Sequence, residues 1–320
     1  MAANHLTMSL SIALDGYWLD KQLEFSPNTV AKYRYFFRRL IAFLGDVELD
    51  QVTTADIRRF LVHLATVPGP SGRILSRRSV HDVWAVLSSF WTWAERELGV
   101  PHIIRGKIKA PSYTEKTVEP LTQADVAALL RAADHQRAYS LPNGKRVRSR
   151  RPSAARDRAI VLTLLDSGLR VSELCGLTVA DYDAARGRLH VRHGKGDKER
   201  FVVVGNRTRK AIWVYLVNRG EAKPSDPLFA ARTNLPLHRS NLRHILARLG
   251  EQAGVPNVHP HRFRHTFAIT FLRNGGNPLL LQKLLGHERL ETVQVYIRLA
   301  EQDIDAGSKY SPADNWGIGG

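Results

Sequence analysis

Apolar residues in the first third of the chain recur at three- and four-residue steps, the spacing of one face of an α-helix. This pattern predicts three amphipathic helices, over Asn28–Gly45, Thr54–Leu64 and Ser79–Leu98. Gly45 is typical of a helix C-terminus, and Asp56 lies in the first turn of the second helix, where an acid is favourable. No helix is predicted before Asn28. We therefore expect an all-helical N-terminal domain over residues 1–104.

The pattern lapses between this region and the next predicted helix, and proline and lysine alternate there instead. Residues 105–120 contain Pro111 and Pro120 together with Lys107, Lys109 and Lys116. Such a composition is typical of an extended connection. We expect a linker over 105–120 and a second domain over 121–320.

The second domain mixes helical spacing with one stretch of period two. Its first helix is predicted from Thr122 and Asp125, a capping pair. Alternating residues from Arg188 to Val204, interrupted by glycines, predict a β-hairpin with Lys195 and Lys198 at its tip. Further helices are predicted over Ala154–Ser167, Thr208–Val217, Ser240–Ala253, His261–Leu272, Pro278–Leu285 and Leu290–Leu299. The predicted fold class is mainly α with a small β-sheet.

The net charge of the chain indicates the kind of partner that it binds. Lysine and arginine number 47 against 30 acids, a net charge of +17. Up to Thr114 there are 14 basic against 10 acidic residues, and beyond it 33 against 20. A surplus of this size suits a polyanion, so we predict a nucleic acid as partner. Tyr139–Pro152 is predicted to be a basic loop, which either touches DNA or a partner or is tolerated at the surface.

Several other classes of site are excluded by what the sequence lacks. Cys175 stands alone, which excludes an internal disulfide and a cysteine-based metal site. The sequence has no phosphate-binding glycine loop ending in Lys-Ser/Thr, no H-E-x-x-H and no G-x-S-x-G. No apolar stretch reaches the length of a membrane span, and the start lacks a secretory pattern. We expect a cytoplasmic protein with no membrane partner, metal or cofactor.

Three short segments of the second domain gather basic residues with a tyrosine. Ser167-Gly168-Leu169-Arg170-Val171-Ser172-Glu173-Leu174 places Arg170 just after a helix-ending glycine. His261 and Arg264 share a helix face, and Leu284-Leu285-Gly286-His287 precedes Tyr296. Each piece has an ordinary structural interpretation: a solvated arginine after a helix cap, hairpin lysines that protect a sheet edge, a tyrosine in an apolar core.

Taken together, these segments resemble the tyrosine recombinase (phage integrase) family in its short Xer-like form, from about Ser26 to Leu299. The resemblance implies an N-terminal helical SAM-like core-binding domain and an α+β catalytic domain that form a C-shaped clamp on DNA. Carried over one position at a time, it assigns six catalytic residues: Arg170, Lys195, His261, Arg264, His287 and Tyr296. Glu173 is expected to support Arg170.

One ambiguity concerns the histidine and arginine three residues apart. His259 and Arg262 show the same spacing, but the residues after Arg264 match the family's continuation, so we choose His261 and Arg264. His259 stands directly before a proline, which is unfavourable for a helical pair. Three histidines, at 259, 261 and 265, could also suggest a metal site, but no acid or cysteine completes the set.

The resemblance implies cleavage of DNA by Tyr296 through a 3′-phosphotyrosyl intermediate, which keeps the bond energy without ATP. Two guanidiniums, Arg170 and Arg264, would hold the phosphate. Lys195 would give a proton to the leaving 5′ oxygen, and His261 would be general base or proton shuttle. His287 would donate a hydrogen bond to the phosphate. Tyr310 is a rival nucleophile, but its spacing from His287 is far from that of the family.

The expected partners are a double-stranded recombination site and three further copies of the chain. By resemblance we expect a homotetramer on two DNA sites, with exchange of the C-terminal tail and a Holliday junction. Candidate DNA contacts are Thr29, Lys32, Arg77, Arg78, Lys198, Arg239, Asn241 and Arg243. Two alternatives stay open: a type IB topoisomerase-like enzyme and a DNA-binding regulator without catalytic activity.

Overall fold

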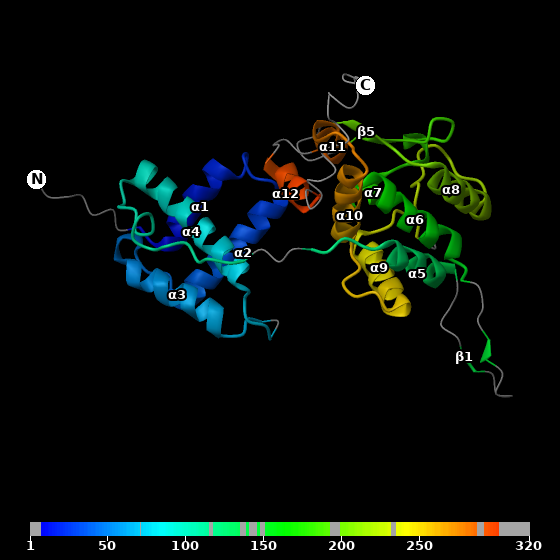
Figure 1. Cartoon of the computed structure of the whole chain (residues 1–320). Coiled ribbons are helices and arrows are strands. Elements are labelled where there is room, and N and C mark those ends of the chain that lie inside the picture. Colours follow the sequence, from blue (N-terminus) through cyan, green and yellow to red (C-terminus); the bar gives the residue numbers. More distant parts are fainter. Residues whose placement is uncertain are drawn as a thin grey trace, which may run out of the picture. The chain divides into compact units, whose positions relative to one another are not determined.

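The computed structural model describes residues 8–70, 72–114, 118–134, 139–140, 146–147, 151–192, 199–231, 235–286 and 291–300. Within these ranges the chain is mainly helical with one three-stranded sheet and one two-stranded ladder, which confirms the predicted fold class. It divides into two compact units, Met1–Lys116 and Thr117–Gly320 (Figure 1). The division falls inside the range that the sequence predicts as a linker.

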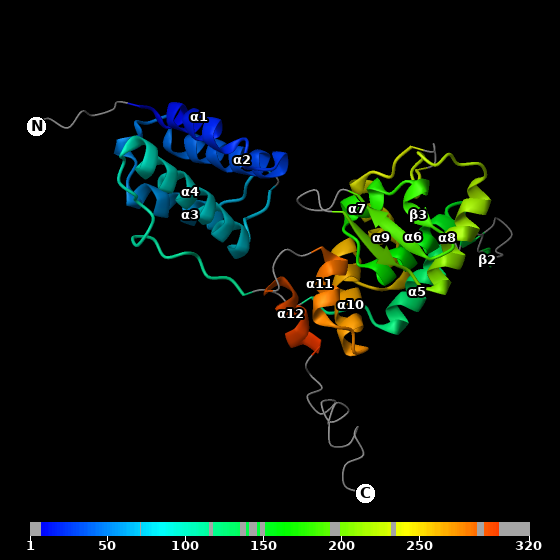
Figure 2. The same ribbon diagram turned by 90° about the horizontal axis from the view of Figure 1, so that it is seen from above.

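The N-terminal unit is a bundle of four helices, which lie beside one another in Figure 2. Its elements are α1 (Leu10–Lys21), α2 (Pro27–Leu44), the short 3-10 turn η1 (Leu49–Gln51), α3 (Thr54–Thr66) and α4 (Arg77–Leu98). Tyr17 is fully buried at its centre, and its ring meets those of Phe37 and Phe90 edge to face at centroid distances of 6.0 and 5.6 Å. Aromatic packing therefore supplies much of this core.

Helices α2, α3 and α4 confirm the three predicted in this region, whereas α1 was missed. The reason lies in its outer face, because Ile12 and Leu19 are exposed while Leu10, Leu14 and Trp18 are buried. Apolar residues all round the helix leave no amphipathic pattern to detect.

The chain that leaves α4 at Gly99 stays packed on the N-terminal unit for another nine residues. Ile104 and Ile108 are buried in its core. The Trp84 indole N–H donates to the carbonyl of Ile108 at 3.2 Å, and Arg58 donates to that of Lys107 at 2.7 Å. The beginning of the predicted linker is thus held against α3 and α4.

The second unit surrounds a buried helix, α6 (Ala154–Ser167). Ile160, Val161, Thr163 and Leu164 on successive faces of this helix are all fully buried, because α5, α8 and α10 pack around it. The other helical elements are α5 (Gln123–Asp134), α7 (Val171–Gly176), the 3-10 turn η2 (Val179–Asp181), α8 (Asn206–Arg219), α9 (Arg239–Ala253), α10 (Pro260–Arg273), α11 (Pro278–Leu285) and α12 (Glu291–Ala300).

The sheet of this unit contains the predicted hairpin. β4 (Arg188–Val191) and β5 (Arg200–Val203) pair antiparallel, and the two-residue strand β3 (Tyr182–Asp183) adds an edge that the sequence did not predict. In the basic 139–152 segment, β1 (Tyr139–Ser140) and β2 (Arg146–Val147) also pair antiparallel, so part of this predicted loop forms a short ladder. In the described part of the chain, no helix is long and apolar enough to cross a membrane.

Candidate active site

The C-terminal end of α11 binds arginines through three consecutive backbone carbonyls. The carbonyl of Leu284 accepts from Arg200 at 2.7 Å, that of Leu285 from Arg264 at 2.7 Å, and that of Gly286 from Arg170 at 3.3 Å. Carbonyls at a helix C-terminus lack partners within the helix and carry partial negative charge, so they attract cations. We call Arg170, Arg200 and Arg264 the arginine cluster.

Arg170 stands at the N-terminus of α7, directly after the end of α6. Gly168 ends α6 in the left-handed conformation with φ of 59°, and a Cβ there would come within 2.5 Å of the Phe267 ring. Only glycine fits, which explains the Gly-Leu-Arg order. The Arg170 guanidinium donates to Glu173 Oε1 at 2.8 Å, and its backbone N–H donates to Oε2 at 2.8 Å. Glu173 therefore fixes both the side chain and the backbone of Arg170.

Glu173 is a buried carboxylate that also binds Arg200. Arg200 donates to Oε1 at 3.0 Å and to Oε2 at 2.7 Å, a bidentate pair. Burial would raise the pKa of Glu173, but the hydrogen bonds and charge of Arg200, helped by Arg170, outweigh it and hold the pKa below its ordinary value. The carboxylate is thus ionised at neutral pH and balances part of the charge of the cluster.

Arg264 is the most deeply buried member of the arginine cluster, at 4% exposure. Its guanidinium donates to the carbonyl of Gly168 at 2.9 Å as well as to that of Leu285, so it joins the ends of α6 and α11. Burial, and next the charge of Arg170, lower the pKa of Arg264 to about 10. Arg264 is still protonated at neutral pH. Because burial and the neighbouring charge of Arg170 disfavour this cation, binding of an anion beside it is favourable.

The rival arginine, Arg262, points to a different part of the unit. Its guanidinium donates to the carbonyls of Glu119 at 3.0 Å and Pro256 at 2.6 Å. His259 accepts from the Arg262 backbone N–H at 3.3 Å and so caps α10. His259 and Arg262 thus hold the start of α10 and the chain before α5. Arg264 instead lies with Arg170 at the C-terminal end of α11.

Tyr296 on α12 lies against the arginine cluster of its own chain and is 6% exposed. Burial raises the pKa of Tyr296; the charge of Arg264, a hydrogen bond from it and the charge of Arg170 act in the opposite direction but do not outweigh burial. The hydroxyl is therefore protonated at neutral pH, with its oxygen hydrogen-bonded to Arg264 and near enough to Arg170 to be influenced by its charge.

Two histidines of α10, His261 and His265, lie near Tyr296 and the arginine cluster. His261 is open to solvent on one side, and the protein packs against the other. This partial burial, and next the charges of Arg264, Arg243 and Arg170, lower the pKa of His261. A neutral imidazole can accept a proton at pH 7. The ring of His265 lies 5.3 Å from that of Tyr296, centroid to centroid. Across the described ranges, no group of three or more His, Cys, Asp or Glu side chains is arranged to hold a metal ion.

Three predicted site residues, Lys195, Lys198 and His287, lie outside the described residues, as does Tyr310. Strands β4 and β5 flank the segment that contains both lysines, and Gly286 directly precedes His287. The structure therefore brings together Arg170, Glu173, His261, Arg264 and Tyr296 among the predicted residues.

The candidate DNA contacts occupy helix starts in both units. Arg77 and Arg78 are exposed in the first turn of α4, and Arg78 lies over the ring of Tyr113 at 5.5 Å. Thr29 is engaged in the cap of α2 with Ser26, and Lys32 pairs with Asp82 at 2.8 Å. On α9, the side chains of Arg239, Asn241 and Arg243 are all exposed. Arg243 is near enough to His261 to lower its pKa, so α9 borders the site.

Sequence reasoning missed Arg200, although strand alternation contains the signal. Val202 and Val204 are buried while Phe201 and Val203 are exposed, so Arg200 shares the inward phase with Val202. A long cation on the inward face needs a carboxylate partner. Four consecutive apolar residues hide this phase, because either alternate pair could face the core.

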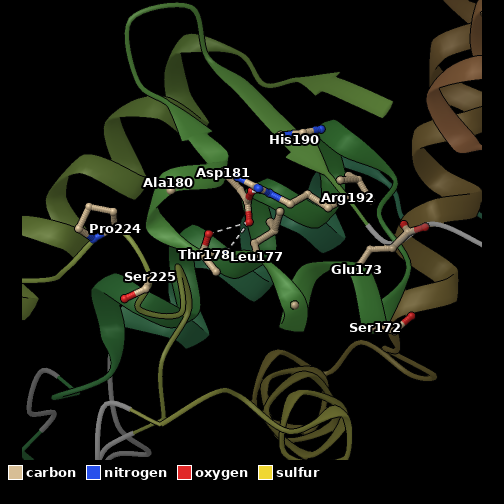
Figure 3. Close-up of a pocket in the computed structure, with 12 residues that line it drawn as sticks. Ser172, Glu173, Leu177, Thr178, Ala180, Asp181, His190, Arg192, Pro224 and Ser225 are labelled. Carbon is tan, nitrogen blue, oxygen red and sulfur yellow. Dashed lines mark hydrogen bonds and ion pairs between the residues drawn. The ribbon is translucent and has the colours of Figure 1, made fainter. Parts of the chain in front are cut away.

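A cavity of about 440 Å³ opens beside Glu173, between α7, η2 and β4 (Figure 3). Four of the polar side chains that line it, Thr178, Asp181, His190 and Arg192, already have partners in the protein. Asp181 accepts from Thr178 at 2.7 Å and pairs with Arg192 at 2.5 Å, and His190 contacts Glu199 at 3.1 Å. This cavity borders the site rather than forming it.

Fold and site define the class of the protein: the chain belongs to the phage integrase family, the tyrosine recombinases. The model of the phage integrase family matches residues 120–303, and the model of the phage integrase N-terminal SAM-like domain matches residues 14–98.

Individual relatives extend over most of the chain. Tyrosine recombinase XerC of Pelobacter propionicus is 32% identical over 88% of this chain and 88% of its own length. Tyrosine recombinase XerA of Thermococcus kodakarensis is also 32% identical, over 87% of both chains. Among solved structures, the integrase of transposon Tn1549 in complex with transposon right-end DNA has the same fold. It has a TM-score of 0.73 at 20% identity, over 90% of this chain and 94% of that one.

Proposed function

We propose that this chain is a site-specific DNA recombinase that cleaves and rejoins DNA through a 3′-phosphotyrosyl intermediate, with no metal and no ATP. The observation that carries the proposal is the position of Tyr296, whose hydroxyl is hydrogen-bonded to Arg264 and lies within the field of Arg170 in the same chain. A phosphodiester bound by the two guanidiniums would have its phosphorus next to the tyrosine oxygen.

In the proposed first step, the Tyr296 oxygen attacks the scissile phosphorus and its proton passes to neutral His261. The new bond joins the tyrosine oxygen to the 3′ phosphate, while the bond to the 5′ oxygen breaks. Arg170 and Arg264 stabilise the additional negative charge of the five-coordinate transition state. By resemblance, Lys195 protonates the 5′ oxygen and His287 donates to the phosphate. The reverse sequence, with a 5′ hydroxyl from another strand, reseals the DNA.

The raised pKa of Tyr296 gives the bound DNA a role in this scheme. A phosphate entering between Arg170 and Arg264 takes over the hydrogen bond that the tyrosine oxygen now receives from Arg264. The released hydroxyl is then able to rotate toward the phosphorus. Burial disfavours the phenolate, so the hydroxyl is a weak nucleophile until that moment.

The direct test is formation of a covalent adduct. The full chain is incubated with a pool of nicked duplexes of randomised sequence, and DNA bound after denaturation is recovered and sequenced. Wild type should form an adduct in the presence of EDTA, and Tyr296→Phe should form none while it still binds the selected duplex. Tyr310→Phe is the matched control and should form the adduct normally. An undiminished adduct in Tyr296→Phe would overturn the assignment.

The proposed assembly is a homotetramer on two recombination sites that exchanges C-terminal tails and passes through a Holliday junction. Crosslinking of the chain on paired copies of the selected duplex should give tetramers, and a branched DNA product should accumulate when resealing is slowed. Relaxation of a plasmid without the selected site would instead favour the topoisomerase alternative. Binding without any adduct would favour the regulator.

A further inference from the structure

The structure assigns to Arg200 a positioning role in DNA cleavage: it holds Glu173, and through it Arg170, in the geometry that the phosphate requires. The inference rests on the proposed function and adds to it a residue that neither motif nor spacing indicated. Arg200 lies in the predicted hairpin that carries Lys195, but the resemblance assigned no role to it.

The first reason is that Arg200 is fully committed to two neighbours. All three of its guanidinium nitrogens donate, Nε to the carbonyl of Leu284 and the two Nη to the two oxygens of Glu173. Its side chain is only 10% exposed. A guanidinium held at three points by a buried carboxylate and a helix end is rigid and has little freedom to bind DNA.

The second reason is that Glu173 is shared. Each of its oxygens accepts one hydrogen bond from Arg200 and one from Arg170. Without Arg200, each oxygen loses one of two donors, and only the hydrogen bonds to Arg170 itself then limit rotation of the carboxylate. Because Glu173 binds both the backbone and the guanidinium of Arg170, that rotation displaces Arg170 as a whole.

The third reason is the exclusion of any side chain above Arg200. Gly286 adopts the left-handed conformation with φ of 62°, and a Cβ at this position would lie 3.1 Å from Arg200 Nη1 and 3.3 Å from its Cζ. The Leu-Gly-His segment therefore needs glycine for two reasons, the turn itself and the space for Arg200 beneath it. A side chain at 286 would therefore press on the guanidinium that binds Glu173.

The test measures single-turnover cleavage of the selected duplex at saturating protein. Arg200→Gln should slow cleavage by about 10- to 100-fold, the loss expected when a catalytic group is misplaced by about 1 Å. The dissociation constant should stay within about twofold of wild type, since Arg200 makes no contact that DNA could replace. Arg200→Lys keeps the charge but not the planar fork, so it should recover only part of the rate.

Two modified substrates separate positioning from loss of structure. A methylphosphonate at the scissile position removes the phosphate charge that Arg170 neutralises, so the difference between wild type and Arg200→Gln should shrink there. A 5′-bridging sulfur leaves without needing a proton from Lys195, so the difference should persist. Equal slowing on all three substrates, or rescue by the sulfur alone, would overturn the inference.

The matched control is Arg192→Gln, which removes another arginine that pairs with a buried carboxylate, Asp181, beside the same sheet. It should cleave at the wild-type rate. Thermal unfolding of each variant monitors folding, and Arg200→Lys replaces Arg200→Gln if the latter unfolds. Absence of an adduct with wild type would contradict the proposed function, whereas full activity of both Arg200 variants would contradict this inference alone.

Discussion

The two units of the chain differ in whether their cores contain charged side chains. In the described part of the N-terminal unit, His102 is the one polar side chain that is buried, and the core is formed by aromatic and aliphatic residues. The second unit buries Asp157, Glu173, Asp181, Arg262 and Arg264. Burying a charge costs free energy unless it is paired and hydrogen-bonded. Two of these buried charges, Glu173 and Arg264, belong to the candidate site, where the arginines must be held rigid.

The difference separates stability from activity in the N-terminal unit and couples them in the second. The N-terminal unit folds around apolar contacts, and its candidate DNA contacts Lys32, Arg77 and Arg78 are exposed side chains that the core does not need. In the second unit the residues that hold the helix ends together are those proposed to bind the phosphate. A mutation there should affect both properties at once.

The largest effect is expected from Glu173→Ala. It leaves Arg170 and Arg200 without their shared carboxylate, and breaking a buried ion pair costs about 3–5 kcal/mol in the free energy of unfolding. Cleavage should be lost as well. Hydrogen exchange read separately on peptides of each unit should show the loss in the second unit only. Equal destabilisation of both units would contradict the separation.

A loss of similar size in the other unit should leave the chemistry intact. Phe90 is fully buried between Tyr17 and Trp91. Phe90→Ala should lower the free energy of unfolding of the N-terminal unit by about 3–5 kcal/mol. At a temperature where the variant is still folded, adduct formation at saturating DNA should proceed at the wild-type rate. A slower rate under those conditions would show that the units are coupled.

A smaller effect is expected from pH. Burial, and next the charge of Arg105, lower the pKa of His102, which accepts two backbone N–H groups through Nδ1. The unfolded chain therefore binds a proton that the folded chain does not, and stability falls as pH drops below about 6.5. His102→Asn keeps an acceptor without a titrating ring and should flatten this dependence.

The same sign applies to the second unit, where burial lowers the pKa values of His259, His261 and His265. Three such groups against one predict a steeper loss of stability for the second unit between pH 7.5 and 5.5. Unit-resolved hydrogen exchange at the two pH values measures both slopes. A steeper slope in the N-terminal unit would contradict the prediction.

The smallest effect concerns exposed cations. Arg77→Gln should lower the magnitude of the log–log salt slope of DNA binding by about 0.9, the value for one phosphate contact. Lys32→Gln should change it less, because Lys32 already pairs with Asp82. Neither should change the cleavage rate at saturating DNA. Titrations of the selected duplex at several salt concentrations measure both slopes.

Local patterns predicted most of the fold, because the helices begin and end at strong signals. α6 and α11 have the predicted bounds, and each is followed by a glycine in the left-handed conformation. α1 and β3 were missed for physical reasons. α1 has apolar residues on its outer face, and a two-residue strand such as β3 is defined by its pairing with β4 rather than by its own sequence.

For the site, the resemblance predicted the residues but few of the partners that hold them. Glu173 lies three residues from Arg170 and was predicted to support it, but nothing local to Arg170 indicates that the carbonyl of Gly286 holds it, since Gly286 is more than a hundred positions away. The raised pKa of Tyr296 also could not be predicted, because burial is a property of the packed unit and here exceeds the effect of the neighbouring arginines. Lys195 and His287 stay predictions.

The carbonyls at the end of α11 have a consequence for how this site can vary. A backbone carbonyl is present whatever side chain the residue carries, so no substitution at 284 or 285 deletes an anchor of the arginine cluster. What matters is the residue at which the helix stops. Insertion or deletion of one residue in α11 would rotate the three carbonyls by about 100°, releasing all three arginines together. The length of this helix is therefore under stronger constraint than its composition.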